Sequence, residues 1–422
     1  MKNSKLWFIL ILLCGVLITV WFGQKSFLAG GEESFFLWNP LLAFKTHVSP
    51  WSNNLRSMGF YLPRLTLIGF AAILQNFGFS IWLIQAFSFL ILLVLGASGV
   101  WMLVRDEKRE VSFFASLFYI FNLYSFSQVW GRFIYNGIFA WALLPWTIYL
   151  FNEWNTHGRL KYIIYFLTIS TILSHSFGNP AFILAIWIPV GIIMLFNFGF
   201  RSLLFAFAWG VTNFWWIYPE LKNSISTFSS ISDWRMNFDS LRGVSQYFST
   251  GQILLLKQRY LFGVNNPWFD YYNHKLIWVI SILILLIAMF GWLKSYNIKA
   301  WKWLTLMALI GWFISKGTTP PFGYGFYHWL FSTFPFMGIL RNSYEKFGIV
   351  WLLPYSVFFA FGLANIKPRL VQVSILILVC GVLVWPMWTG DIFKDIHVKV
   401  LEYYKEANDY LNKDRSLGRI LM

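Results

Sequence analysis

The sequence predicts an all-α fold, a polytopic bundle of transmembrane helices, on three observations. Of the 422 residues, 58% are hydrophobic and only 12% are charged, and the mean hydropathy is +0.59. Apolar runs recur that approach the roughly 20 residues an α-helix needs to cross the hydrocarbon core. These runs do not alternate apolar and polar residues with a period of two, which excludes an outer-membrane barrel.

The first predicted span is the apolar run from about Leu6 to Phe22, after the basic stretch Met1–Lys5. It is longer than the core of a signal peptide and lacks a small-x-small cleavage site, so we expect it to be retained. Hydropathy and charge predict about ten further spans. They are Ile81–Val104, Val111–Phe126, Phe133–Phe151, Ile163–Phe177, Ala181–Phe196, Ser202–Tyr218, Leu276–Leu293, Leu304–Ser315, Phe347–Ile366 and Val371–Trp388. In Gly59–Phe79, Arg64 and the Gly/Pro-broken pattern favour an interfacial helix.

With about eleven spans, the connections on one side of the membrane are all short and basic. Their clusters are Arg105–Arg109, Arg159–Lys161, Arg201, Lys294–Lys302 and Lys367–Arg369. Because Lys and Arg in short loops stay on the cytoplasmic side, we expect the N-terminus inside and the C-terminus outside. The long loops, about 24–80, 219–275 and 316–346, then all lie on the outer face of a multi-pass protein of the cytoplasmic membrane.

The predicted domain organisation is a transmembrane module, residues 1–390, followed by an extracytoplasmic tail, residues 391–422. From about Ile392 to Leu411, apolar residues recur at helical spacing, which predicts an amphipathic surface helix. The last residues, Arg419–Met422, resemble the start of a strand, as expected for a truncated domain.

Some sites and activities are disfavoured by what the sequence lacks. The six histidines are scattered, and no HExxH, cysteine-cluster or EF-hand motif occurs, so no metal site is predicted. Cys14 and Cys380 fall inside predicted spans and imply no disulfide framework. The spans are almost free of ionisable residues, with His175 near an outer end, which argues against an ion-coupled transporter. We expect membrane lipids, and no nucleic acid, among the partners.

Glu32 and Glu33 are the only acidic residues among the first hundred. They follow the first span and head a loop that carries Lys45, Arg56 and Arg64, an arrangement that suggests chemistry at a membrane surface. The alternative interpretation is that both are hydrated acids near a helix start, where they complement the helix dipole.

The outer loops also carry three groups of basic residues that topology does not explain. They are Arg56 with Arg64; Arg235, Arg242, Lys257 and Arg259; and Arg341 with Lys346. Such groups suit anionic lipid headgroups or a lipid-linked phosphate, with Arg binding in bidentate fashion. The alternative is that they snorkel at the membrane interface. Aromatic residues are dense in the same loops, where they form an interfacial belt or stack on sugars.

Stretches of the outer loops resemble one enzyme family. They are Gly30–Pro40, Gly59–Pro63, Trp215–Pro219 with Ser240–Gly243, and Gly338–Phe347. They are similar to the first outer loop, the Gly-Tyr-Leu-Phe-Pro element, the Trp-Trp…Pro and Leu-Arg-Gly pair, and the Leu-Arg-Asn…Lys-Phe motif of a group of GT-C membrane glycosyltransferases. This group is related to actinobacterial α-(1→3)-arabinofuranosyltransferase D. YfhO-type membrane proteins are a more distant likeness.

The resemblance implies an inverting transferase that moves a sugar, arabinofuranose or another pentose or hexose, from a polyprenyl-phosphate donor to a cell-envelope glycan or glycolipid. The family's general base is an acid of the first outer loop, usually Asp, and which of Glu32 and Glu33 corresponds to it stays open. A positioned carboxylate can take the proton of an attacking hydroxyl. The lipid phosphate leaves as an anion and needs basic residues. Some GT-C enzymes use a divalent cation, Mg²⁺ or Mn²⁺.

The candidate residues for the donor and substrate follow from the same loops. The candidate phosphate-binding residues are Arg341, Lys346, Arg242 and Arg56, and the candidate substrate-lining residues are Tyr61, Asn342, Trp38 and His328. Two other functions compete with the transferase. A lipid or glycan transporter or flippase needs a polar pathway between helices, for which the spans offer little. A non-catalytic envelope scaffold needs only the outer loops.

Overall fold

The computed structural model describes residues 4–30, 34–48, 62–231, 233–257 and 272–398, together with four single residues of the tail, Tyr403, Glu406, Ala407 and Tyr410. Glu32, Glu33, Arg56 and Tyr61, among the candidates named above, lie outside the described residues.

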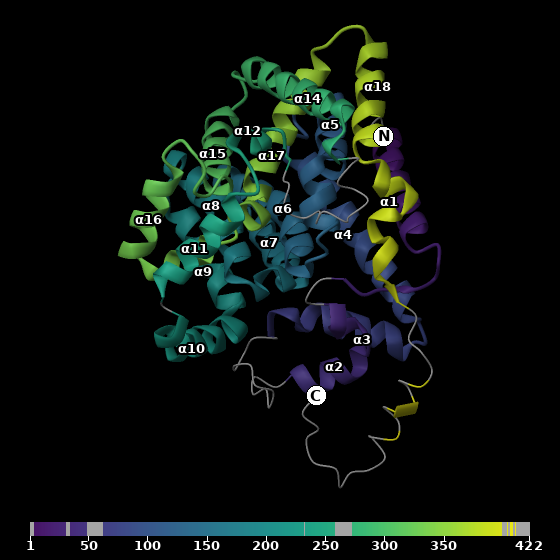
Figure 1. Cartoon of the computed structure of the whole chain (residues 1–422), viewed down its shortest axis with the longest axis vertical. Helices are drawn as coiled ribbons and strands as arrows, with labels where there is room; N and C mark the ends of the chain where they lie inside the picture. Colours follow the sequence, from purple (N-terminus) through teal and green to yellow (C-terminus); the bar gives the residue numbers. More distant parts are fainter. Residues whose placement is uncertain are drawn as a thin grey trace.

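The described residues confirm the all-α class (Figure 1). The α-helices are α1 Ser4–Trp21, α2 Pro40–His47, α3 Leu65–Asn76, α4 Ile81–Leu103, α5 Arg109–Ile120, α6 Tyr135–His157, α7 Leu160–Ile172, α8 Pro180–Phe196, α9 Phe200–Thr212, α10 Phe214–Ile231, α11 Trp234–Ser245, α12 Thr250–Leu254, α14 Lys275–Lys294, α15 Trp301–Ser315, α16 Gly323–Thr333, α17 Ser343–Ala364, α18 Arg369–Ile377 and α19 Trp385–Thr389. The 3-10 helices are η1 Ser34–Leu37, η2 Leu62–Arg64, η4 Ser174–Gly178, η5 Pro335–Leu340 and η7 Asp391–Ile396, and the π-helices are η3 Ser125–Trp130 and η6 Leu378–Leu383. In the described ranges, strand structure is confined to β1 Phe27–Leu28 and β2 His397–Val398.

Every predicted span coincides with helical structure, but four are divided: those at 111–126, 163–177, 202–218 and 371–388. The span predicted at 202–218 splits into α9 and α10 at Asn213, whose side chain binds Trp209 O (3.0 Å) and the indole of Trp216 (2.9 Å). Asn side chains that bond locally compete in this way with continuous helix. The last predicted span divides into α18, η6 and α19, with Pro386 in the first turn of α19, where its missing N–H costs nothing.

Three of the described helices are long and apolar enough to cross a membrane: Ile81–Leu103, Lys275–Lys294 and Ser343–Ala364. Other apolar helices, including α1, α7, α8, α9 and α15, are shorter. The structure therefore supports a membrane protein, whereas the count of about eleven spans and their orientation remain predictions.

Side-chain contacts gather several of the short basic loops at one end of the bundle, here called the short-loop end. The contacts are Arg105 with Glu153 (3.1 Å), Arg201 with the backbone of Asn155 (3.0 Å), Arg369 with Glu110 (3.8 Å), and the rings of Trp7 and Trp101 (5.7 Å between centroids). The other ends of the same helices carry the long loops, here called the long-loop end. The two kinds of connection thus lie on opposite sides of the fold.

Helix α17 is the centre of the bundle and is almost wholly buried. It meets α14 and α15 through glycines: Gly291 lies directly against Phe358 O and Gly362, and Gly311 lies against the backbone of Trp351. A side chain at these positions would overlap the neighbouring backbone. Small residues allow this close approach, which is how helices gain contact area in an apolar environment.

Helices α2 and α3 lie together across the lower end of the view in Figure 1, at a steep angle to α1 and α4. The side chain of Gln75 on α3 accepts the backbone N–H of Leu41 on α2 (2.9 Å), and Gly69 faces Phe44. The crosswise direction of α3 agrees with the predicted interfacial helix, whose residues 59–61 lie outside the described part.

The start of the tail differs from the predicted amphipathic helix. Residues Asp391–Ile396 form a 3-10 helix, and His397 and Val398 form β2, which pairs antiparallel with β1 (Phe27 with Val398, Leu28 with His397). The chain is not helical here because its backbone pairs with backbone N–H and C=O groups of the first loop. If residues 397 and 398 were part of a surface helix, those loop groups would have to bond to water instead.

Helix α4 completes this small sheet through a side chain. Gln85 accepts the N–H of Leu28 (2.9 Å), donates to Leu28 O (2.9 Å) and donates to the hydroxyl of Tyr135 (2.7 Å). Gln85 is fully buried. The start of the first long loop is therefore fixed to α4 and to the tail.

Candidate functional site

Arg341 lies at the long-loop end, on the turn between η5 and α17. Its Nη1 donates to Oδ1 of Asn237 on α11 (3.2 Å), and the Arg341 side chain is otherwise exposed. Asn237 is buried against Gly338, where an added Cβ would come within 2.6 Å of the Asn237 amide. Gly338 is thus needed for the amide to reach and orient the guanidinium. Asn342 and Lys346 follow Arg341 and are half-buried.

Helix α11 brings two further candidates to the same region. The ring of His328 on α16 lies 5.3 Å from the rings of Trp234 and Phe238 on α11, and His328 is exposed. Arg242 is exposed on α11 itself. Trp38 lies elsewhere, with its ring 5.6 Å from Phe27 of β1. The structure therefore joins Arg341, His328 and Arg242 through α11 and separates Trp38 from them.

The described residues on either side of Glu32 and Glu33 are closely packed. Gly30 is so close to Phe133 and Ile396 that an added Cβ would lie 2.8 Å from each side chain. Phe133 has a positive φ of 59°. A bulky residue in this conformation is strained, and such strain clusters at functional sites.

Arg64 lies beside this loop and is buried, with 3% of its surface exposed. Its guanidinium lies 5.0 Å from the centre of the Phe36 ring, and Gly178 leaves room for it on the other side. The interpretation that Arg64 snorkels at the interface is therefore wrong. A buried guanidinium places a permanent positive charge inside the protein beside the first long loop.

Sequence reasoning missed Glu220, which is half-buried on α10. Burial raises the pKa of its carboxyl group, and the nearby charge of Arg64 partly opposes this. The pKa of His47 is lowered, chiefly by burial, and the charge of Arg64 adds to this effect. Glu220 follows the Trp215–Pro219 motif directly, which is the signal that could have singled it out.

Arg132 and Glu345 form a second feature that the sequence did not reveal. Arg132 Nη2 lies 2.8 Å from Glu345 Oε2, and the hydroxyl of Tyr124 donates to Glu345 O (2.7 Å). Glu345 is only 8% exposed. It lies one helical turn after Arg341, inside the Gly338–Phe347 motif, whereas nothing local marks Arg132 as its partner.

Two buried lysines stiffen the neighbouring loops. Lys257 donates to Tyr272 O (2.7 Å), and its Nζ lies 3.8 Å from the centre of the Trp278 ring. Burial lowers the pKa of Lys257 to about 8. Lys316 donates to Thr319 O (2.6 Å) and Pro321 O (2.5 Å), and burial lowers its pKa as well. Lys257, predicted to be an exposed basic residue, is instead 1% exposed.

An apolar groove of about 650 Å³ lies between α8, α15, α16 and η5. Its lining exposes no polar surface and includes Leu340, the residue before Arg341, although Arg341 itself does not line it. A cationic residue thus follows, in the sequence, one residue that lines an apolar groove, the kind of site in which ligands bind.

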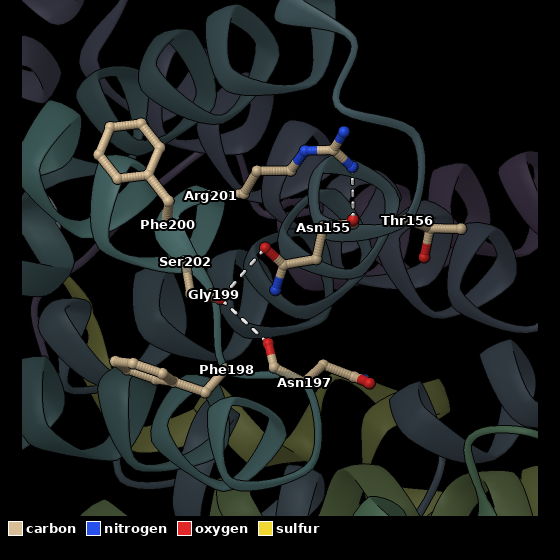
Figure 2. A pocket seen from close by; sticks show the side chains of 8 residues that line it. All are labelled: Asn155, Thr156, Asn197, Phe198, Gly199, Phe200, Arg201 and Ser202. Atoms are coloured by element: carbon tan, nitrogen blue, oxygen red, sulfur yellow. Dashed lines mark hydrogen bonds between the residues drawn. The ribbon is translucent and has the colours of Figure 1, made fainter.

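The short-loop end holds a more polar pocket of about 580 Å³, between the end of α6 and the start of α9. Figure 2 shows Asn155 and Ser202 turned toward each other, 3.2 Å apart, with Arg201 reaching the backbone of Asn155. In the part of the chain that the structure describes, no three His, Cys, Asp or Glu side chains are grouped to hold a metal ion.

No protein-family model and no curated protein matches the chain. Among solved structures, the chain is similar to the cryo-EM structure of the arabinofuranosyltransferase AftD from Mycobacteria, with a TM-score of 0.67 at 14% sequence identity. The match covers 96% of this chain and 29% of AftD, so the chain spans less than a third of that enzyme's length. At this identity the likeness shows the fold alone, and the chain therefore has a GT-C-like helical membrane fold.

Proposed function

We propose that the protein is a GT-C-type membrane glycosyltransferase that transfers a sugar from a polyprenyl-phosphate donor to a glycan or glycolipid acceptor. The observation that carries the proposal is the position of Arg341 directly after Leu340, which lines an apolar groove, in a fold similar to that of an arabinofuranosyltransferase. The reaction takes place at the long-loop end, which is the extracytoplasmic face if the short basic loops are cytoplasmic.

The donor binds with its isoprenoid chain in the groove and its phosphate at Arg341. Among the described residues, Asn237 is the side chain to which Arg341 donates a hydrogen bond, so most of the five guanidinium donors remain available. A guanidinium can hold two phosphate oxygens at once, which orients the sugar-phosphate bond. Arg242, His328 and Asn342 lie around the same region, where Lys346 adds a second positive charge.

The acceptor hydroxyl attacks the anomeric carbon from the face opposite the phosphate. Glu32 or Glu33 takes the hydroxyl proton as the new C–O bond forms, and the bond to phosphate breaks with both electrons going to the phosphate oxygen. The products are the glycoside, with inverted configuration, and polyprenyl phosphate. Positive charge at Arg341 stabilises the leaving phosphate without the need for a general acid. Two residues beside this loop support an acid of the pair as the base: Arg64, which is buried, and Phe133, whose backbone is strained.

The test is a transfer assay in membrane vesicles containing the full chain, with decaprenyl-phosphoryl arabinofuranose, mannose and glucose as probes. Release of decaprenyl phosphate is measured by mass spectrometry. Of Glu32→Gln and Glu33→Gln, one should lower the rate by at least about 100-fold, as loss of a general base does. Asp239→Asn, which removes an exposed carboxylate of α11, is the matched control and should keep wild-type activity.

Full activity in Glu32→Gln, Glu33→Gln and the double variant would contradict the mechanism. Movement of an intact donor across the vesicle membrane, with no release of decaprenyl phosphate from any probe, would favour the flippase alternative instead.

A further inference from the structure

A second groove, separate from the proposed donor groove, lies at the short-loop end between α4, α6 and α7. Its volume is about 440 Å³, and most of its lining is apolar. Trp146 and Leu150 of α6 and Ile169 of α7 form the apolar part. Tyr165 on its rim is 57% exposed. The groove therefore opens at the outside of the bundle, where lipid surrounds a membrane protein.

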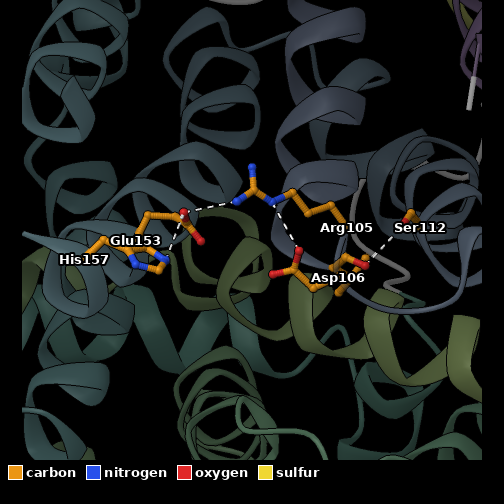
Figure 3. A network of polar contacts seen from close by, with 6 residues as sticks. Arg105, Asp106, Ser112, Glu153 and His157 are labelled. Atoms are coloured by element: carbon orange, nitrogen blue, oxygen red, sulfur yellow. Dashed lines mark hydrogen bonds and ion pairs between the residues drawn. The ribbon is translucent and has the colours of Figure 1, made fainter. Parts of the chain in front are cut away.

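The end of this groove toward the short basic loops is cationic. Arg105 and Lys161 both line it. Figure 3 shows Arg105 held between Asp106 and Glu153, with His157 beyond Glu153. The Arg105–Glu153 distance is 3.1 Å and the His157–Glu153 distance is 3.9 Å. Glu153 is 9% exposed, so this ion pair is a rigid part of the wall.

Lys161 differs from Arg105 in its partners. Its Nζ lies 5.0 Å from the centre of the Tyr162 ring, and the side chain is exposed at the edge of the groove. Among the described residues, Lys161 has no carboxylate within ion-pair distance, whereas Arg105 is flanked by two, Glu153 at 3.1 Å and Asp106 at 3.5 Å. The groove thus combines an apolar channel with an exposed cation, Lys161, that forms no ion pair with the described carboxylates.

We propose that this groove binds one anionic phospholipid, with an acyl chain along Trp146, Leu150 and Ile169 and the phosphodiester at Lys161. A phosphodiester carries a single negative charge and balances Lys161. Basic pockets between membrane helices, at the level of the headgroups, are the usual sites for such lipids. Arg105 contributes further donors from a fixed position. This site is independent of the proposed transfer reaction and of the donor groove.

The experiment is native mass spectrometry of the full chain in detergent, titrated with dioleoylphosphatidylglycerol or dioleoylphosphatidylcholine. These lipids share acyl chains and differ in headgroup charge. Wild type should retain one phosphatidylglycerol with an affinity about fivefold or more above that for phosphatidylcholine, since one basic side chain near the surface contributes about 1 kcal/mol. Lys161→Gln should abolish this preference, and Lys161→Arg should keep it.

Two further variants separate the headgroup from the channel. Lys299→Gln removes an exposed cation from another short loop and should change nothing. Thr168→Trp places a large side chain in the groove from an exposed position on α7 and should remove the bound lipid whatever its headgroup. Thermal unfolding of each variant checks that it is folded before titration.

Equal retention of the two lipids by wild type would overturn the proposal. So would a preference for phosphatidylglycerol that survives both Lys161→Gln and Thr168→Trp, because the lipid would then bind elsewhere.

Discussion

The guanidinium of Arg132 lies 2.8 Å from the carboxylate of Glu345 and so joins two parts of the proposed site that are far apart in sequence. On one side, the next residue, Phe133, contacts Gly30 at the edge of the first long loop. On the other side, Glu345 is one turn of α17 away from Arg341. The ion pair therefore connects the loop that precedes the proposed base to the start of α17, the helix that follows the proposed phosphate ligand.

Breaking this pair should destabilise the fold. Arg132→Ala removes a cation 2.8 Å from the buried carboxylate of Glu345, and we expect the free energy of unfolding to fall by about 3 kcal/mol. This is at the low end for buried pairs, because the Arg132 side chain is 24% exposed. Thermal unfolding in detergent measures the effect. The double variant Arg132→Ala with Glu345→Ala should lose less than the two single losses added together, and simple additivity would contradict a direct pair.

Arg341 should be sensitive even to a change that keeps its charge. Arg341→Lys retains a cation but loses the bidentate grip on phosphate and the geometry of the bond to Asn237. We expect kcat/KM for sugar transfer to fall by about tenfold or more in this variant, and by a larger factor in Arg341→Ala. Arg235→Lys, an exposed arginine on α11, is the control in the same assay. Equal effects at both arginines would point to a general charge effect.

The glycine contact between α14 and α17 should tolerate no side chain. Gly291→Ala places a methyl group on Phe358 O, so the helices must separate along their length. We expect a loss of about 3 kcal/mol or more, or failure to accumulate as folded protein. Gly191→Ala in α8 is the matched control, since nothing lies within 4 Å of its added Cβ. Comparable thermal stability of the two variants would show that the close contact is not essential.

Lys257 should make stability depend on pH in the alkaline range. Its pKa is about 8 in the fold and 10.5 for the ordinary side chain, so the unfolded chain binds more protons between these values. Stability from this residue is therefore present above pH 10.5 and is lost as pH falls through about 8. At pH 7 the cost is about 3 kcal/mol. Relative to wild type, Lys257→Met should gain most in melting temperature at pH 7 and least near pH 10.5; a constant difference would contradict the shift.

Gln85 should be hard to replace, because one side chain serves Leu28 twice and Tyr135 once. Gln85→Leu leaves these buried groups without their partner, and we expect a loss of about 3 kcal/mol in unfolding free energy. Gln75→Leu, which removes a single half-exposed hydrogen bond to Leu41, should cost about 1 kcal/mol. If the two variants unfold at the same temperature, the hydrogen bonds between Gln85 and Leu28 contribute little to stability.

The helical bundle could be predicted from the sequence because membrane helices are apolar over most of their length, and this pattern is local. Breaks set by one side chain, such as Asn213, were missed because an Asn within an apolar run does not reveal which neighbours it binds. The short helices α11 and α16 lie in loops whose mixed composition hides their helical period. The tail was predicted to be helical from Ile392, since the pairing of His397 with Leu28 depends on residues far away in the chain.

The candidate site divides in the same way. Arg341 could be found because it lies in a motif next to a predicted span, and its position beside an apolar groove supports that choice. Arg132 and Glu345 are 213 positions apart, and no local pattern pairs them. Lys257 and Arg64 were placed at a surface because charged residues in loops are usually exposed. Only the fold shows that aromatic rings and backbone carbonyls enclose them.

The amide of Gln85 bonds to both backbone groups of Leu28 and so takes the place of a neighbouring strand that is one residue long. The start of the first long loop is therefore held by helix α4 as well as by the tail. Any rotation or tilt of α4 within the bilayer would carry Leu28 with it, and β2 as well through its pairing with β1. A displacement of α4 would therefore be transmitted to the start of the loop on which the proposed chemistry depends.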